Sequence, residues 1–143
     1  MIFREIKKED IPFLVSSSTY DFKDGWSKEL LESAFMTERF GGLIVSVNNE
    51  DVGYITFDLG LGDADIEEVF VLPDRRKEGI AYSLMKEVFS YLQNKGVTKI
   101  FLEVRESNCP ARALYEKCGF NKINERKKYY RDGENAIVYL KEF

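Results

Sequence analysis

The feature that most constrains this chain is a long amphipathic helix predicted between two β-rich runs. The apolar side chains on one side of that helix recur at helical spacing: Ile80, Ala81, Leu84, Met85, Val88, Phe89 and Leu92. Gly96 fits a C-terminal cap. Residues 66–72 before the helix and residues 100–104 after it read as strands. A strand, a helix and a second strand in this order favour a mixed α/β sheet with helices on its faces.

The rest of the chain extends the pattern to β α α β β β α β α β β, around one central mixed sheet. The other predicted strands cover residues 2–6, 41–47, 52–57, 120–130 and 136–143. The first two helices follow from two apolar stripes: Ile11, Leu14 and Val15, then Leu30, Leu31, Ala34 and Phe35. Internal repeats and linker-like segments are absent from the sequence, so residues 1–143 are expected to form one domain.

The absence of histidine removes several kinds of chemistry. Ser/His/Asp and Cys/His nucleophile systems and His-ligated zinc all need an imidazole, and no metal is expected. Two cysteines, Cys109 and Cys118, are too few for a disulfide scaffold and suggest a reducing, cytoplasmic setting. The start of the chain turns charged at its fourth residue, and no apolar run approaches the ~20 residues of a membrane helix. Acid–base chemistry must therefore use carboxylates, tyrosines, lysines, thiols or backbone groups.

Charge is distributed unevenly along the chain. Residues 1–71 hold six basic and 15 acidic side chains, whereas residues 72–143 hold 15 basic and 10 acidic ones. This pattern suits one anionic and one cationic ligand, although uneven surface charge explains it equally well. It is a poor pattern for nucleic acid, which needs a broad basic face.

Three segments have residue types that can carry chemistry. Residues 75–81 (RRKEGIA) place a glycine and basic side chains at the start of the long helix, which favours either a phosphate site or a solvated basic turn. Glu103 ends a strand where α/β sheets place ligands, but it could also pair with Arg105. Tyr115 lies on the next predicted helix, which Ser107 or Asn108 can cap, and its hydroxyl could be purely structural.

Together these segments resemble the GNAT (GCN-five-related) N-acetyltransferase superfamily, and within it the RimI family of ribosomal-protein N-terminal alanine acetyltransferases. The matching blocks are Arg76-x-x-Gly79-x-Ala81, Leu102-Glu103-Val104-Arg105-x-Ser107-Asn108 and Leu114-Tyr115-x-x-x-Gly119-Phe120. The resemblance is firm over residues 66–143 and looser over 1–65.

The resemblance implies roles for particular residues. The groups implied to hold acetyl-CoA as co-substrate are Val69, Phe70, Val71, Arg76, Lys77, Glu78, Gly79, Ile80, Ala81 and Asn108. Glu103 would be the general base, through a water, and Tyr115 the general acid that protonates the leaving thiolate. The residues implied to contact the acceptor are Trp26, Ser27, Tyr129 and Tyr130.

Several alternatives stay open. Glu67 and Glu68 are rival bases, because other members of the superfamily place the carboxylate on that strand. Glu78 should weaken binding of a pyrophosphate unless it turns to solvent or pairs with Arg75. The acceptor would be a protein N-terminus, with a small-molecule amine or a non-catalytic acetyl-CoA-binding module as alternatives. No nucleic-acid or membrane partner is expected, and the chain would be a monomer or homodimer.

Overall fold

The computed structural model describes residues 1–22 and 24–143, which fold around a seven-stranded mixed sheet of order β1-β2-β3-β4-β5-β7-β6. The strands are β1 (Ile2–Glu5), β2 (Phe40–Val47), β3 (Glu50–Leu59), β4 (Asp63–Val71), β5 (Lys99–Arg105), β6 (Asn121–Arg126) and β7 (Ala136–Glu142). Neighbouring strands are antiparallel except for β4 and β5, which run parallel. The helices are α1 (Ile11–Asp21), α2 (Lys28–Phe35), α3 (Ile80–Asn94) and α4 (Cys109–Lys117).

The predicted element order and mixed α/β class are confirmed. Of the helices described, none has the length and apolar character that crossing a bilayer requires.

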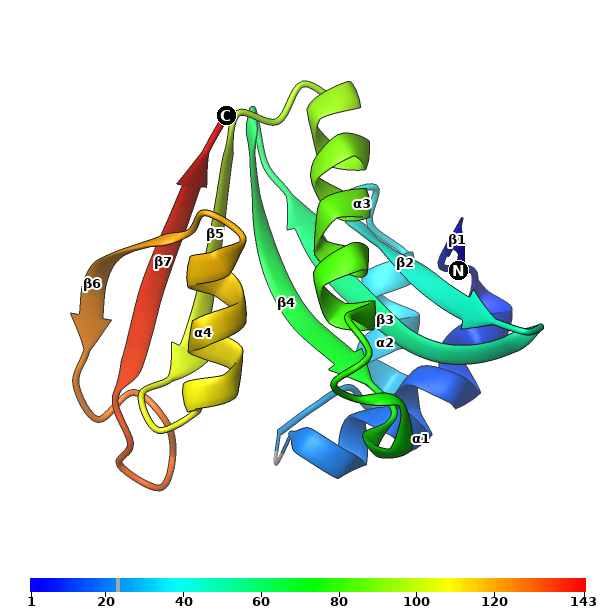
Figure 1. The fold of residues 1–143 in the computed structure, drawn as a ribbon, viewed down its shortest axis with the longest axis horizontal. Helices are drawn as coiled ribbons and strands as arrows, with labels where there is room; N and C mark the ends of the chain where they lie inside the picture. Colours follow the sequence, from blue (N-terminus) through cyan, green and yellow to red (C-terminus); the bar gives the residue numbers. More distant parts are fainter. Residues whose placement is uncertain (23) are drawn as a thin grey trace.

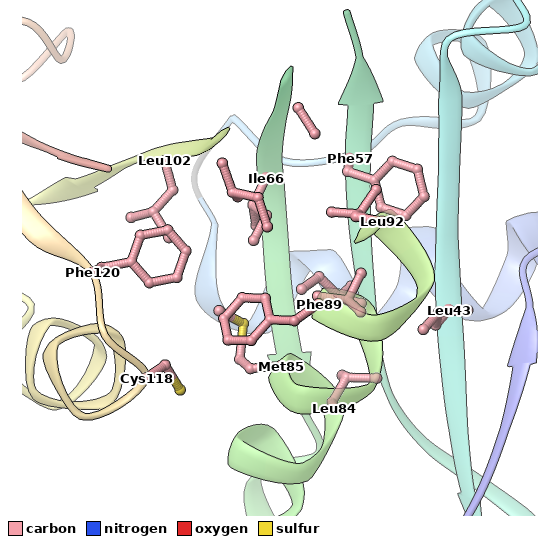
Figure 2. Close-up of a cluster of buried hydrophobic side chains, with 14 of the residues drawn as sticks. Leu43, Phe57, Ile66, Leu84, Met85, Phe89, Leu92, Leu102, Cys118 and Phe120 are labelled. Carbon is pink, nitrogen blue, oxygen red and sulfur yellow. The ribbon is translucent and has the colours of Figure 1, made fainter. Parts of the chain in front are cut away.

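The helices cover the two faces of the sheet in pairs, with α3 and α4 on one face and α1 and α2 on the other (Figure 1). The larger core lies under α3, where Leu84, Met85 and Phe89 meet side chains from the central strands (Figure 2). The smaller core consists of Leu14, Leu31, Ile44, Tyr54 and Phe70. Each face of the sheet therefore has its own apolar layer.

Helix α3 forms because its sequence has one continuous apolar side. Its buried residues are Ile80, Leu84, Met85, Val88, Phe89 and Leu92, all of which belong to the predicted stripe. Burying one such side chain contributes roughly 1.5–3 kcal/mol, so this stripe is enough to hold the helix on the sheet. Gly96 follows the helix at φ +86°, as the predicted cap requires.

Two local predictions differ from the structure. Leu30 is 54% exposed and lies outside the core, so only part of the stripe predicted for α2 faces the sheet. The strand predicted over residues 120–130 ends at Arg126. The chain turns at Lys128, which has φ +51° and donates its backbone N–H to Asn135 Oδ1 at 2.9 Å. Tyr129 and Tyr130 therefore lie in the β6–β7 turn and not in a strand.

A β-bulge divides β4 into two parts. Thr56 of β3 faces Glu68 and the next residue, Phe57, faces Ile66, which leaves Glu67 as the extra residue. Before the bulge, alternate residues such as Ile66 face α3. After it, Val69 faces α3, whereas Phe70 joins the opposite core. The bulge thus exchanges the faces of all the residues that follow it.

The bulge lies where β4 and β5 separate. The two strands pair from Asp63 with Lys99 to Ile66 with Leu102, and the pairing described ends there. Beyond this point they diverge toward their C-terminal ends (Figure 1). The ends of β4 and β5 therefore border an opening in the middle of the sheet.

Candidate active site

The separated edge of β4 presents free backbone groups to the opening. Leu72 donates its N–H to Val52 of β3 at 2.8 Å. Because successive N–H groups of a strand point to opposite edges, those of Val69 and Val71 point toward the opening and that of Phe70 toward β3. The carbonyl of Val71 accepts a hydrogen bond from Arg76 Nε at 2.9 Å. The opening therefore offers two N–H donors that an extended ligand could bind.

The turn that leads into α3, residues 76–81, has the geometry of an anion site. Lys77 and Gly79 both adopt positive φ, +65° and +80°, and Gly79 is the N-cap of α3. In the described chain the N–H groups of Gly79, Ile80 and Ala81 have no protein acceptor. These donors and the positive end of the helix dipole favour a bound phosphate.

The charged side chains of this turn have partners within the protein. Glu78 pairs with Arg75 at 3.3 Å, one of the two arrangements expected for a carboxylate beside a phosphate site. Arg76 pairs with Asp21 at 2.6 Å and lies over the ring of Phe70. The guanidinium of Arg76 thus ties the α3 turn to the end of α1, while the backbone of the turn stays available.

A pocket of about 520 Å³ lies on the other side of the opening and is rich in carboxylates. The charged and aromatic residues that line this acidic pocket are Asp58, Asp65, Glu67, Phe101, Glu103, Arg126, Tyr129 and Tyr130. Glu103 pairs with Arg126 at 3.4 Å, and the Arg105 alternative is not realised, because Arg105 pairs with Asp132 and Glu134. Four carboxylates against one arginine give the pocket a negative character that attracts cations.

The environment of Glu67 changes its acidity. Its side chain is partly open to solvent but lies in the pocket, where burial raises the pKa of its carboxyl to about 7. The nearby charges of Asp58, Glu68 and Asp65 act in the same direction. A carboxyl with such a pKa exchanges a proton near neutral pH, as a general base must.

Glu68 occupies a different environment, although it is the next residue. The bulge turns it toward α1, and it is 9% exposed. Its carboxylate accepts hydrogen bonds from the Tyr54 hydroxyl at 2.6 Å and from Ser18 Oγ at 3.0 Å. Burial raises the pKa of this carboxyl. Glu68 is therefore held in the smaller core, away from the acidic pocket.

Tyr115 lies on the α3–α4 face of the sheet, opposite the acidic pocket. Its ring packs edge-on against Phe120 and Tyr139, with ring centroids 6.0 and 6.3 Å apart. Within residues 1–22 and 24–143 its hydroxyl has no hydrogen-bond partner. Burial raises the pKa of Tyr115, and nearby Cys118 and Tyr130 add to the effect, so the phenol keeps its proton at neutral pH. Glu103 and Tyr115 thus lie on opposite faces of the sheet, Glu103 in the acidic pocket and Tyr115 on the α3–α4 face.

The remaining predicted site residues have structural roles as well. Asn108 caps α4 by accepting the N–H of Ala111 at 3.3 Å, and Ser27 caps α2 by accepting the N–H of Leu30 at 3.1 Å. The indole of Trp26 packs edge-on against Phe40 and donates to Thr56 Oγ1 at 3.2 Å. Neither Trp26 nor Ser27 lines the acidic pocket.

The α1–α2 loop, residues 24–27, nevertheless reaches the same region. Asp24 pairs with Arg131 at 3.7 Å, and Arg131 follows the pocket residue Tyr130. The structure thus brings the two predicted acceptor segments together at one end of the molecule. Sequence reasoning does not single out Asp58 and Asp65 for this site. The period of the strand could have suggested Asp65, which lies two residues before Glu67.

Comparisons with known proteins agree on one family. Residues 3–120 match the model of the acetyltransferase (GNAT) family. The [ribosomal protein bS18]-alanine N-acetyltransferase of Haemophilus influenzae is 38% identical over 105 residues, 71% of each chain. The Escherichia coli K12 protein of the same name is 33% identical over 116 residues, 79% of this chain and 78% of that one. The crystal structure of the ribosomal-protein-S18-alanine N-acetyltransferase from Escherichia coli has a TM-score of 0.90 at 28% identity, and the match covers 99% of this chain and 92% of that chain.

Proposed function

Because this chain belongs to the acetyltransferase (GNAT) family, as a RimI-like N-acetyltransferase, we propose that it acetylates the N-terminal α-amino group of a protein. The first candidate is a ribosomal protein with an N-terminal alanine, since the relatives with 33–38% identity are named for that substrate. The observation that carries the proposal is the opening between β4 and β5, which has an anion site on one side and a carboxylate-rich pocket on the other.

The free backbone donors fit acetyl-CoA as the co-substrate. The N–H groups of Gly79, Ile80 and Ala81 would bind its pyrophosphate, and those of Val69 and Val71 would bind its extended arm. When bound, acetyl-CoA supplies an acetyl thioester whose carbonyl an amine can attack. The N–H of Val69 or Val71 is suited to stabilise the negative charge that develops on that carbonyl oxygen.

The acidic pocket would receive and deprotonate the acceptor. An α-ammonium group has a pKa near 7.7–8.0, so a weak base is enough to free the amine. We assign Glu103 as that base, acting through a water, with Glu67 as the rival that lines the same pocket. The buried hydrogen bonds of Glu68 to Tyr54 and Ser18 argue against it as the base.

Tyr115 would act from the other face. As the new C–N bond forms and the C–S bond breaks, Glu103 takes the proton from nitrogen and Tyr115 gives one to sulfur. The free hydroxyl of Tyr115 and its protonated state at neutral pH support this role. Acid–base assistance of this kind contributes ~10²–10⁴-fold, and holding the two reactants together contributes ~7–11 kcal/mol. Positioning is therefore the larger part of the proposed catalysis.

The proposal is tested by following free thiol release from acetyl-CoA with a panel of acceptors. We expect turnover with peptides that begin with alanine, including the N-terminal peptide of ribosomal protein S18. The matched control is the same peptide already acetylated at its N-terminus, which should be inert because its α-amino group is blocked. Any lysines it carries remain free, so turnover with this peptide would reveal acetylation of lysine instead. Turnover with polyamines or aminoglycosides alone would replace this proposal by the small-amine alternative. Binding of acetyl-CoA without any turnover would favour the non-catalytic module.

A further inference from the structure

One buried network has no part in the chemistry described above. The carboxylate of Glu68 lies between β3, β4 and α1, where Tyr54 is fully buried and Ser18 is 1% exposed. Both hydroxyls donate to it, at 2.6 Å from Tyr54 and at 3.0 and 3.2 Å from Ser18. A buried carboxylate is costly unless its oxygens are hydrogen-bonded, and here both oxygens accept. Two buried hydroxyls are thus directed at one buried carboxylate.

The network continues into the α1–α2 loop. The backbone N–H of Trp26 donates to Ser18 Oγ at 2.8 Å, so Ser18 accepts from the loop and donates to Glu68. A serine hydroxyl can do both at once, and the carboxylate fixes its direction because an ionised carboxylate only accepts. Trp26, Ser18 and Glu68 therefore form one directed chain of hydrogen bonds from the loop to β4.

The packing around Gly25 shows how closely the loop lies on this anchor. A Cβ atom at Gly25 would lie 2.0 Å from Ser18 Oγ and 3.2 Å from Glu68 Oε2. There is no room for a side chain at this position while Ser18 holds the carboxylate. The loop backbone is thus seated directly on the network.

The anchor and the acidic pocket share the bulge of β4. Glu67 lines the pocket and Glu68 holds the loop, so the bulge brings two adjacent carboxylates to the α1–α2 face of the sheet, one in the pocket and the other beside α1. The other end of the loop is tied to the β6–β7 turn by Asp24 and Arg131. Any displacement of the loop from Glu68 would therefore change the border of the pocket.

We propose that Glu68 is a positioning residue, which fixes the α1–α2 loop beside the acceptor pocket through Ser18 and the Trp26 backbone. This inference rests on the proposed function in taking that pocket as the acceptor side. Glu68 does not touch the reacting atoms. It holds the loop in place before the acceptor arrives, so the loop need not be ordered on binding.

The test compares two substitutions that each remove one hydroxyl from the same carboxylate. Ser18→Ala breaks the link to Trp26, whereas Tyr54→Phe removes the β3 partner and leaves that link intact. We expect Ser18→Ala to raise the KM for the acceptor peptide by ~10-fold or more, because the loop loses one buried, charge-assisted hydrogen bond. The KM for acetyl-CoA should change by less than about twofold, because the cofactor-side donors are untouched. Tyr54→Phe should lower Tm but leave the acceptor KM within about twofold.

A second readout does not depend on turnover. Trp26 is the single tryptophan of the chain, so its fluorescence reports the position of the loop directly. Ser18→Ala should shift its emission to longer wavelength and increase quenching by acrylamide, and Tyr54→Phe should not. Glu68→Gln, which keeps the volume, should move both readouts in the direction of Ser18→Ala. The double variant Ser18→Ala/Glu68→Gln should have an acceptor KM only slightly higher than that of Ser18→Ala, since both substitutions act through one chain of hydrogen bonds.

The possible outcomes separate this inference from the proposed function. If Ser18→Ala and Tyr54→Phe alter KM and Trp26 fluorescence alike, Glu68 only stabilises the core and the inference is wrong. If the wild-type protein acetylates no peptide, the proposed function fails, and the fluorescence comparison still decides whether Glu68 anchors the loop. If Ser18→Ala does not fold, the same two readouts on Glu68→Gln decide the matter.

Discussion

At the scale of single residues, the acidic pocket contains two carboxylates that can accept the proton of the amine. Glu103 is ion-paired with Arg126, and Glu67 titrates at a pKa of about 7. We expect Glu103→Gln to lower kcat/KM by ~10²-fold or more and Glu67→Gln by about 10-fold or less. Rates with a fixed peptide, measured from pH 5.5 to 9 for both variants and the wild type, check this order.

The pH profiles carry further information. If the ionisation of Glu67 limits the wild-type rate on the acidic side, Glu67→Gln should remove the limb near pH 7, while Glu103→Gln should keep it. A larger loss of rate in Glu67→Gln than in Glu103→Gln would reverse our assignment. In that case the bulge residue is the base.

Glu67 also predicts how stability depends on pH. Its pKa is raised from 4.5 to about 7 in the folded protein. Between these values the unfolded chain loses the proton and the folded chain keeps it, so the favourable contribution is complete below pH 4.5 and declines as the pH rises through 7. Glu67→Gln should therefore raise Tm more at pH 8 than at pH 5. Thermal scans of both proteins check this, and a Tm difference that is constant with pH would contradict it.

Tyr115 is the residue whose removal should affect catalysis without affecting binding. We expect Tyr115→Phe to lower kcat by ~10²–10⁴-fold, because the proton for the leaving sulfur is lost. Binding of acetyl-CoA should be nearly unchanged, since the ring contacts with Phe120 and Tyr139 remain. The raised pKa makes this phenol a weaker acid, so the expected loss is toward the lower end of that range. Titration calorimetry and single-turnover rates separate the two effects, and an unchanged rate would exclude Tyr115 as the acid.

At the scale of secondary-structure elements, the spacing of apolar residues in the sequence predicts which side of a helix or strand is buried. The stripe of α3 and the alternation of Ile100, Leu102 and Val104 in β5 both follow from the side of the element that meets the core. The β2–β3 hairpin turns at Asn48 and Asn49, which both adopt the positive φ that such a turn needs and that asparagine tolerates. The spacing and type of residues within each of these segments are therefore enough to predict it.

The bulge in β4 could not be predicted in the same way. Residues 66–72 read as one regular strand, although the extra residue Glu67 exchanges the faces of Glu68 and Val69. Its place is set by pairing with β3 and by the separation from β5, which are contacts between distant segments. The sequence therefore identified Glu67 and Glu68 as rivals but could not show that only Glu67 lines the pocket. The turn at Lys128 was also missed, because it depends on a hydrogen bond to the Asn135 side chain seven residues later, which strand periodicity does not indicate.

The α3 turn offers a prediction with a matched control. Gly79 and Gly62 both have φ near +80° and open space where a Cβ would lie. Alanine at either position should cost about 1–2 kcal/mol of stability through the left-handed backbone conformation. Only Gly79→Ala should also raise the KM for acetyl-CoA, since Gly79 caps the helix at the proposed pyrophosphate site. Equal effects on that KM in the two variants would place the pyrophosphate elsewhere.

At the scale of the whole molecule, the acidic and basic halves of the sequence match the acidic pocket and the α3 turn only in part. The basic second half supplies the α3 turn but also Arg126 and Arg131, which lie on the pocket side. The acidic first half supplies three of the four pocket carboxylates, Asp58, Asp65 and Glu67, while Glu103 comes from the second half. Sequence halves are therefore not spatial halves. The opening between β4 and β5, to which both halves contribute, is what brings opposite charges to the two sides of one site.

This arrangement predicts which amides acetyl-CoA should protect. The N–H groups of Val69 and Val71 point into the opening, whereas that of Phe70 points to β3. Amide hydrogen exchange followed by NMR should slow at Val69 and Val71 when acetyl-CoA is added, as well as at Gly79, Ile80 and Ala81. Exchange at Phe70 is the internal control and should change little, because its N–H has a partner in the free protein. Uniform slowing along residues 69–71 would mean that the cofactor stabilises the whole strand and does not bind to its open edge.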